Sequence, residues 1–438
     1  MSERQKVLEL FEEQKDYFED RVKNGIENNR KGWCRLEFNY NKKQCKNIRI
    51  AIKQKNHEFR YGANMFMLDE FENEEKNKKY RKYFAETFNM ATLPFYWSDL
   101  EPERGKVRYD KNSPKIYRRP SPDLCIEYCE ENGIEPREHA LAYSSFFPNW
   151  IDINNPESIK KDLEKRYKEI AERYADKIPT IEVTNETWWD EFQNALYNED
   201  DFVEYCFKLA RKYFLKNKLG INEYSAVWNE QGRNRDKYYM QIERALNSGA
   251  DINAIGIQYH MFFKMEKEFE ATRKFYDPSH LYRILDRYSD FNLPIQITEV
   301  TIPAYTDGEE DEQIQAEIIK KLYSLWFSHK NVEQIIYWNL IDGYAAFAPQ
   351  GDMQSGENYY RGGLFRFDFT PKPSYYVIKN LFEKEWRTET EITLNENGVG
   401  RFKGFYGEYE LKFEYDGKEY TKNINLSKNG VNEFKIVL

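Results

Sequence analysis

The 438-residue sequence lacks the cysteine pattern of a disulfide framework or a zinc site. Its five cysteines are an odd number, and no two of them form a Cys-x-x-Cys pair. Cys125 and Cys129 stand at helical spacing without a histidine cluster nearby. This usage is typical of a reducing compartment or an anaerobic habitat, and it disfavours a small disulfide-stapled fold.

Long apolar runs are also missing. Residues 1–30 are rich in Glu and Lys with helical periodicity and contain no apolar core of a signal peptide. No later run reaches the roughly 20 apolar residues that a membrane helix needs. We therefore predict no membrane partner. If Met1 is the native start, the protein is expected to be cytoplasmic, and otherwise to be secreted with its signal removed.

The sequence has no basic block and no glycine-rich phosphate loop after a strand. The net charge is −9, which disfavours nucleic acid as a partner. Aromatic residues, in contrast, make up 17% of the chain. Most of them are expected in the core, but flat sugar faces pack well on aromatic rings, so this richness also suits an oligo- or polysaccharide ligand. The oligomeric state is not readable from the sequence.

Short apolar stretches alternate with charged helical stretches through most of the chain. Eight predicted strands over roughly 320 residues are the expected count and span of a (β/α)8 barrel in the α/β class. A doubly wound sheet is the competing layout, and the missing phosphate loop disfavours it. The strands are predicted to begin near Phe59, Met90, Glu138, Thr180, Tyr224, Ala254, Pro294 and Glu333. Helices are predicted over 156–174, 201–215 and 311–328.

The two ends of the chain differ from this pattern. Residues 1–30 predict an N-terminal helix, and residues 31–56 predict a β-hairpin outside the barrel, which spans 57–385. Residues 386–438 contain short alternating runs and turns, which predict a small antiparallel β-sandwich-like domain. Because a few short strands make a thin core, the hairpin is expected to complete this domain. A structural buttress is favoured over a carbohydrate-binding module for it.

Two strand-like runs each deliver a glutamate where a strand meets a loop. One ends at Asn185-Glu186, and the other contains Glu299. Cleavage of a glycosidic bond needs one carboxylic acid and one carboxylate of this kind. The spacing by itself does not assign the two roles.

Further polar and aromatic groups stand at the predicted strand ends. Because functional groups gather at the C-terminal ends of barrel strands, we expect them on one rim. They are His139, Tyr143, Ser144, Asn229, Glu230, Gln258, His260, Trp338 and Asp342. His57, His280 and His329 belong to no such group and are expected at the surface.

Several short blocks, in order, resemble glycoside hydrolase family 10, which is typified by endo-β-1,4-xylanases. The resemblance covers roughly residues 59–382. Its blocks are Thr184–Glu186, Ile255–His260 and Ile297–Glu299, with further matches at 101–105, 137–150, 338–342 and 369–376.

The resemblance implies a retaining mechanism without a cofactor or a metal. It implies that Glu186 is the acid/base and Glu299 the nucleophile, with their carboxyl groups ~5–5.5 Å apart. Asn185 would bond the sugar 2-hydroxyl, and His260 would orient Glu299. Gln258, His139 and Trp97 would line the floor around the sugar, and Trp338 would be its stacking platform. Less direct candidates are Tyr143, Asn229 and the pair Trp188 and Trp189 on the leaving-group side.

The sequence departs from the family around this centre. A polar Asn-Glu…Lys cluster is usual after strand two, where this chain has Leu93-Pro94-Phe95-Tyr96-Trp97. After strand three, Tyr143, Ser144 and Phe146 replace a tryptophan, a histidine and a glutamine. A site loses discrimination by orders of magnitude when its hydrogen-bonding partners are exchanged. Xylan or xylo-oligosaccharides are therefore one reading, and another β-linked glycan or glycoside is the alternative.

Two hypotheses from other classes remain. A non-catalytic glycan-binding barrel would bind sugar without turnover, although both glutamates are present. A metal-dependent barrel hydrolase would need a His-x-His motif after a strand or a lysine carbamate site, and the sequence shows neither.

Overall fold

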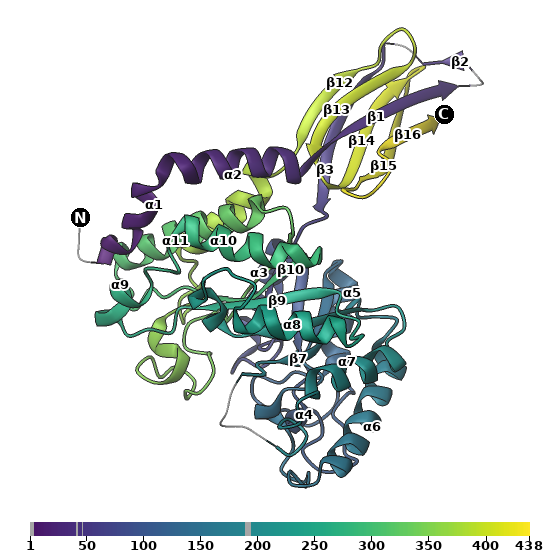
Figure 1. Ribbon diagram of the computed structural model, residues 1–438. Coiled ribbons are helices and arrows are strands. Elements are labelled where there is room, and N and C mark those ends of the chain that lie inside the picture. The colour runs from purple at the N-terminus through teal and green to yellow at the C-terminus, as the bar shows by residue number, and fades with distance from the viewer. Residues whose placement is uncertain (1–3, 41–42, 46, 189–193) are drawn as a thin grey trace.

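The computed structural model of the protein describes residues 4–40, 43–45, 47–188 and 194–438. Its centre is a closed barrel of eight parallel strands that follow chain order around the ring, as predicted (Figure 1). The strands are β4 (Arg60–Asn64), β5 (Met90–Pro94), β6 (Glu135–His139), β7 (Thr180–Asn185), β8 (Lys218–Glu223), β9 (Ala254–His260), β10 (Ile295–Thr301) and β11 (Val332–Tyr337). Every residue of β5, β7 and β10 is buried, because the strands lie between a filled interior and a ring of helices.

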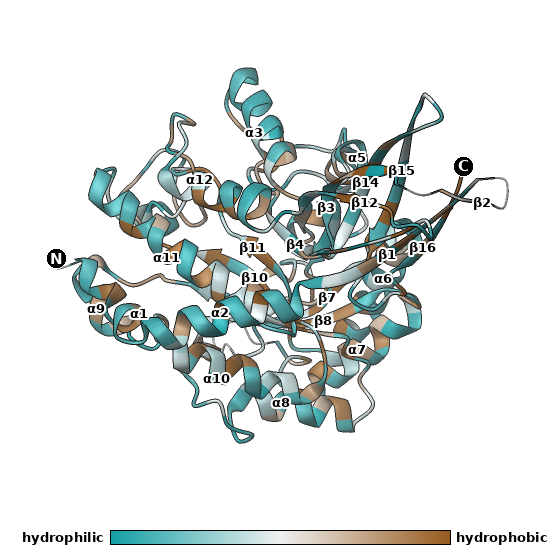
Figure 2. Ribbon diagram, turned by 90° about the horizontal axis from the view of Figure 1, so that it is seen from above, coloured by the Kyte–Doolittle hydropathy of each residue, from teal (hydrophilic) through white to brown (hydrophobic). Residues whose placement is uncertain are grey.

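The helices that cover the barrel are amphipathic, with hydrophilic residues on their outer faces (Figure 2). In α6 (Pro156–Tyr174), Asn155 accepts a hydrogen bond from the backbone N–H of Ser158, and Pro156 occupies the first turn. Both features favour a helix start, and the predicted bounds are confirmed. The other covering helices are α3 (Glu74–Thr87), α5 (Pro122–Asn132), α7 (Phe202–Tyr213), α8 (Lys237–Asn247), α10 (Pro278–Tyr288), α11 (Glu309–Ser328) and α12 (Pro373–Asn380). Short helices α4 (Trp97–Leu100) and α9 (Glu268–Ala271) lie in the loops.

Two barrel strands begin earlier than predicted. β6 starts three residues before Glu138, and β8 occupies 218–223 rather than the segment after Tyr224. The β8 sequence contains glycine, asparagine and lysine, which have low strand propensity, and only its place in the barrel makes it a strand. The aromatic run after it forms a 3-10 helix over Ser225–Asn229, which buries Trp228.

The N-terminal segment consists of a 3-10 helix (Arg4–Leu8), α1 (Glu9–Glu13) and α2 (Lys15–Asn29), where a single helix was predicted. It packs on the barrel through the buried rings of Phe11 and Phe18. At its end, the guanidinium of Arg30 donates to the carbonyl oxygens of His329 and Val332, each at 2.6 Å. The predicted surface positions of His57, His280 and His329 are wrong. These rings are 3%, 3% and 4% exposed and fill gaps between the barrel and the elements around it.

Strands from both ends of the chain build one β unit beside the barrel (Figure 1). One sheet has the order β13-β1-β16, with β2 (Lys43–Gln44) also paired to β1, and the other has the order β12-β3-β14-β15. β1 (Lys31–Tyr40) pairs antiparallel with β13 (Val399–Phe405) and parallel with β16 (Glu433–Val437). β3 (Arg49–His57) lies between β12 (Glu389–Thr393) and β14 (Gly407–Tyr415), which in turn pairs with β15 (Lys418–Leu426). We propose residues 31–56 and 386–438 as one folding unit, beside the barrel at 57–385.

Candidate active site

Eight of the ten site residues proposed from the sequence lie around one point at the C-terminal end of the barrel. Glu186 follows β7, and Glu299 lies on β10, three strands further around the ring. The other six are Asn185, His139, Gln258, His260, Trp338 and Tyr143.

Glu299 is 4% exposed and receives two polar contacts. The amide Nδ2 of Asn222 donates to its Oε1 at 3.2 Å, and Nε2 of His260 lies 3.1 Å from its Oε2. The other ring nitrogen of His260 lies 2.9 Å from the hydroxyl of Thr301. Burial lowers the pKa of His260 to about 4, so its ring is neutral at neutral pH and can donate to Glu299 through Nε2.

Glu186 stands at the point where β7 ends, with a φ of 51°. This left-handed conformation is rare for residues other than glycine and is concentrated at functional sites. The hydroxyl of Tyr143 donates to Oε2 of Glu186 at 2.6 Å, and Nε2 of Gln258 donates to Oε1 at 2.8 Å. The Glu186 carboxyl is thus oriented from both of its edges.

Asn222, near the end of β8, links Glu299 to Asn185, and Gln258 in turn donates to both Asn185 and Glu186. Besides Glu299, the Asn222 Nδ2 donates to Oδ1 of Asn185 at 2.9 Å, while the Asn222 Oδ1 accepts from the hydroxyl of Thr298 at 2.7 Å. The Asn222 side chain lies so close to the backbone of the next strand, β9, that the facing position there must be glycine. A Cβ at Gly256 would stand 2.5 Å from the Asn222 Oδ1.

A buried charged layer lies beneath Glu299. Glu182 is fully buried on β7 and forms ion pairs with Arg137 and, at 2.8 Å from Oε1 to Nδ1, with His139. Burial opposes ionisation of Glu182, but Arg137 and His139 outweigh it and lower its pKa. Burial likewise opposes the charge on His139, but the negative charge of Glu182 outweighs the effect of burial and raises the His139 pKa. The Nε2 of His139 lies 4.0 Å from the Glu299 Oε1, so a proton on this ring places a positive charge beside that carboxyl.

The pKa of Glu299 is raised to about 8. Burial is the largest cause, and the negative charges of Glu186 and Glu182 add to it, against the opposing charge of His139. Removing the carboxyl from water thus outweighs the cation beneath it. The site favours a proton on this carboxyl until the pH approaches 8.

Aromatic side chains close the part of the rim above β4, β5 and β6. Phe66 and Tyr96 are 1% and 6% exposed, and the ring of Phe146 stacks on Tyr96 at 4.0 Å. The guanidinium of Arg119 lies 4.5 Å from the centre of the Tyr96 ring. We call these four residues the β4–β6 wall. Trp338, after β11, contacts both the wall and the two histidines next to Glu299, with its ring 5.0 Å from Phe66, 5.5 Å from His139 and 6.1 Å from His260.

Two residues proposed from the sequence lie outside this cluster. The indole of Trp97 donates to Glu101 at 3.0 Å and packs on Trp150, so it is part of the core behind the site. Its neighbour Tyr96 takes the place next to His139. Asn229 is exposed at the end of a 3-10 helix because β8 begins six residues earlier than predicted and ends at Glu223. Trp188 is half-buried near Tyr224, at 5.7 Å between ring centres, whereas Trp189 lies outside the described residues.

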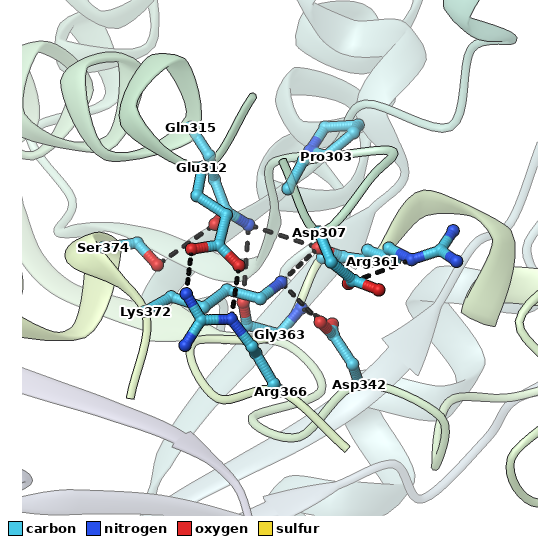
Figure 3. A network of polar contacts seen from close by, with 12 residues as sticks. Pro303, Asp307, Glu312, Gln315, Asp342, Arg361, Gly363, Arg366, Lys372 and Ser374 are labelled. Atoms are coloured by element: carbon cyan, nitrogen blue, oxygen red, sulfur yellow. Dashed lines mark hydrogen bonds and ion pairs between the residues drawn. The ribbon is translucent and has the colours of Figure 1, made fainter. Parts of the chain in front are cut away.

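The loop between β11 and α12 is anchored by a polar network (Figure 3). Lys372 and Asp342 form an ion pair at 2.5 Å, and their side chains are only 0% and 1% exposed. The Lys372 ammonium also donates to the carbonyl of Arg361, and Asp342 accepts from the N–H of Gly363 at 2.7 Å. The network fixes both ends of the loop. Asn339, next to Trp338 in sequence, donates to Glu357 of the same loop at 2.6 Å.

Sequence reasoning missed the buried residues that support the site, namely Arg137, Glu182, Asn222, Glu223 and Tyr96. Two signals could have found some of them. Polar residues alternate along β7, which is the pattern of side chains that fill a barrel interior. The dipeptide Asn222-Glu223 also repeats the Asn185-Glu186 ending of the preceding strand. Among the described residues, no cluster is arranged to hold a metal ion.

The profile of Glycosyl hydrolase family 10 matches residues 51–381. The chain belongs to glycosyl hydrolase family 10. This family-10 chain is 23% identical over 393 residues to Anti-sigma-I factor RsgI6 of Acetivibrio thermocellus. The match covers 87% of this chain and 45% of that protein. It is also 23% identical to a Beta-1,4-xylanase of Dictyoglomus thermophilum, over 68% of the chain and 88% of the xylanase. The family-10 chain therefore spans less than half the length of the first of these relatives.

Solved structures agree with the barrel of this family-10 chain. Xylanase 10B from Thermotoga petrophila RKU-1, solved in complex with xylobiose, superposes with a TM-score of 0.58 at 22% identity. The match covers 75% of this chain and 95% of that one. In the part of the family-10 chain that the structure describes, no helix is long and apolar enough to cross a bilayer.

Proposed function

We propose that the protein is a retaining glycoside hydrolase that cleaves β-linked glycans of the xylan type by double displacement. The observation that carries this proposal is the pair of carboxyl groups at Glu186 and Glu299. They stand at the ends of β7 and β10, three strands apart around one barrel mouth, and are connected through Asn222, Asn185 and Gln258. Two carboxyls on either side of a glycosidic bond are sufficient for this chemistry.

Glu299 is proposed as the nucleophile. It is the deeper carboxyl, and Asn222 and His260 place N–H donors on both of its oxygens. Such donors favour the anion, but burial outweighs them and raises the pKa to about 8, so the ionised fraction that attacks grows as the pH rises toward 8. The anion attacks the anomeric carbon, the bond to the leaving oxygen breaks, and a covalent glycosyl ester forms. Water then displaces Glu299 in the second step.

Glu186 is proposed as the acid/base. It is less buried than Glu299, and Trp188 follows it on the side where the leaving group departs. Its proton goes to the leaving oxygen in the first step, and it takes a proton from the attacking water in the second. Tyr143 and Gln258 hold the carboxyl in place for both transfers.

Asn185 and Trp338 are proposed to bind the reacting sugar. The Oδ1 of Asn185 accepts from both Asn222 and Gln258, which orients its amide so that Nδ2 is the donor for the sugar 2-hydroxyl. The Trp338 ring, held between His139 and His260, offers a flat face to the sugar.

Two variants test the assignment of roles. Glu299→Ala should abolish hydrolysis of every β-glycoside. Glu186→Ala should lose activity on poor leaving groups but keep it on dinitrophenyl glycosides, whose leaving group needs no proton, and azide should give a β-glycosyl azide. The matched control is Glu230→Ala, because this carboxyl accepts from Tyr288 away from the site. Unchanged turnover in Glu299→Ala, or equal losses on both leaving groups in Glu186→Ala, contradicts the assignment.

A further inference from the structure

The two sides of the barrel mouth differ in the space they leave for a bound chain of sugars. In the proposed mechanism, the leaving group lies beside the acid Glu186, next to Trp188 and Tyr224 after β7 and β8. The sugars on the non-reducing side must extend away from Glu186, across Trp338 toward β4 and β5. This direction ends at the β4–β6 wall.

The aromatic rings of the wall are buried against one another, as side chains are in a hydrophobic core. Phe66 contacts Tyr96 at 5.7 Å and Trp338 at 5.0 Å between ring centres, and both Phe66 and Tyr96 are more than nine-tenths buried. Phe146 stacks on the other face of the group and contacts Tyr143 at 5.1 Å. An open cleft for a further sugar would leave these faces exposed to solvent.

Arg119 lies over the three aromatic rings of the wall. Its guanidinium lies 4.5 Å from Tyr96, 5.4 Å from Phe66 and 5.6 Å from Phe146, measured to the ring centres. Asp99 holds it through a hydrogen bond of 2.6 Å. The cation thus sits on three rings at once, which adds cation–π attraction to the packing.

The loop that carries Arg119 is fastened on three sides. Arg108 is 4% exposed and donates to the carbonyls of Pro114 and Asp99, which folds the loop on itself. Lys115 donates to the carbonyl of Asp69, after β4, at 2.7 Å. Arg118 donates to Oδ1 of Asn339, after β11, at 2.9 Å. The loop therefore bridges the strand ends next to the wall and holds it closed.

The hydroxyl of Tyr96 is a polar group on the otherwise aromatic surface of the wall. Its hydroxyl lies 3.0 Å from Nε2 of His139, whose other nitrogen faces Glu182. When His139 is protonated, both of its ring nitrogens donate, so the Tyr96 oxygen accepts from His139 and the Tyr96 proton is available to a sugar oxygen. The wall can thus bind the terminal hydroxyl of one sugar while leaving no room for a second.

We propose that the β4–β6 wall ends the site after one sugar on the non-reducing side, so that the enzyme removes single sugars from the non-reducing ends of β-linked oligosaccharides. This inference rests on the proposed function and adds the mode of cleavage. The residues that determine it are Tyr96, Phe146 and Arg119.

The test compares matched substrates with one or two sugars before the cleaved bond. 4-Nitrophenyl β-xyloside and β-xylobioside, with their glucose equivalents, give kcat/KM for release of nitrophenol. Reducing-end-labelled xylohexaose gives the first products by mass. We expect faster turnover of the one-sugar substrates and a labelled pentaose as the first product. Faster nitrophenol release from the two-sugar substrate, or early labelled trimers and tetramers, overturns the inference.

Opening the wall gives a second readout. In Phe146→Ala combined with Arg119→Ala, the ratio of two-sugar to one-sugar kcat/KM should rise at least about tenfold, since one fitted apolar group in a pocket discriminates by that order. Phe146→Ala alone keeps the Arg119–Asp99 ion pair and guards against a folding defect. Tyr376→Ala, an exposed ring on α12, is the control. An unchanged ratio in folded variants overturns the inference, whereas no turnover of any substrate by the parent enzyme contradicts the proposed function itself.

Discussion

Replacing Glu299 by glutamine should stabilise the protein while abolishing its activity, and the stabilisation should depend on pH. The carboxyl is 4% exposed, and its pKa is raised from 4.5 to about 8, with burial as the largest cause. Between these pH values the folded state holds more protons than the unfolded state. Its stability therefore falls as pH rises through this window. Glutamine resembles the protonated acid and carries no charge at any pH.

The size of the effect follows from the shift. Each pKa unit corresponds to about 1.4 kcal/mol, so the shift is worth roughly 5 kcal/mol above pH 8 and roughly 3 kcal/mol at pH 7. Below pH 4.5 the carboxyl is protonated in both states, and this contribution vanishes. The loss of charge-assisted bonds from Asn222 and His260 subtracts a smaller amount, since the amide oxygen still accepts from one donor.

The assay is urea unfolding of the parent and Glu299→Gln from pH 4 to pH 9, with Glu408→Gln as a control for an exposed glutamate. We expect the difference in unfolding free energy between variant and parent to be near zero at pH 4, to grow through neutral pH and to level off above pH 8. A difference that is constant from pH 5 to pH 8, or a variant less stable than the parent at pH 8, would refute the reasoning. The control should follow the parent throughout.

Three further predictions concern the support of the site and the fold. Gly256→Ala places a Cβ against the Asn222 amide and should lower kcat by roughly 10²-fold, measured on an aryl glycoside with the melting temperature as control. Lys372→Met leaves the Asp342 charge buried without its cation and should cost about 3–5 kcal/mol of unfolding free energy, with little loss if Asp342→Asn is added. Truncation after Trp386 removes the partners of β1 and β3 and should give insoluble protein, and a soluble, active truncation would contradict one shared β unit.

The stability predictions share one physical reason. The barrel mouth keeps Glu138, Glu182, Glu223 and Glu299 almost entirely out of water. Burial raises the pKa of Glu223 to about 8 as well, with the charge of Glu186 adding to it. An interior of apolar residues would be more stable, so this end of the barrel is organised for charge placement at the expense of stability.

Much of the fold could be predicted because local signals and tertiary demands agree. The β7 and β10 segments are rich in β-branched residues and are buried on both faces, and α6 carries both a capping asparagine and a first-turn proline. The β8 segment was not predicted as a strand, because its glycine, asparagine and lysine do not favour one. Its error of six residues moved the predicted strand end from Glu223 to Asn229 and Glu230, and so hid Asn222.

The sequence by itself determined the barrel, the family and the two strand-end glutamates, because alternation, strand ends and short blocks are properties of neighbouring residues. Only the tertiary structure decided what surrounds those glutamates. The Asn222 amide donates to Glu299 and lies against Gly256, Tyr96 rather than Trp97 meets His139, and a loop brings Arg119 onto the aromatic rings of the wall. These contacts join residues from separate strands and loops, and burial and charge there depend on the closed ring rather than on any one segment.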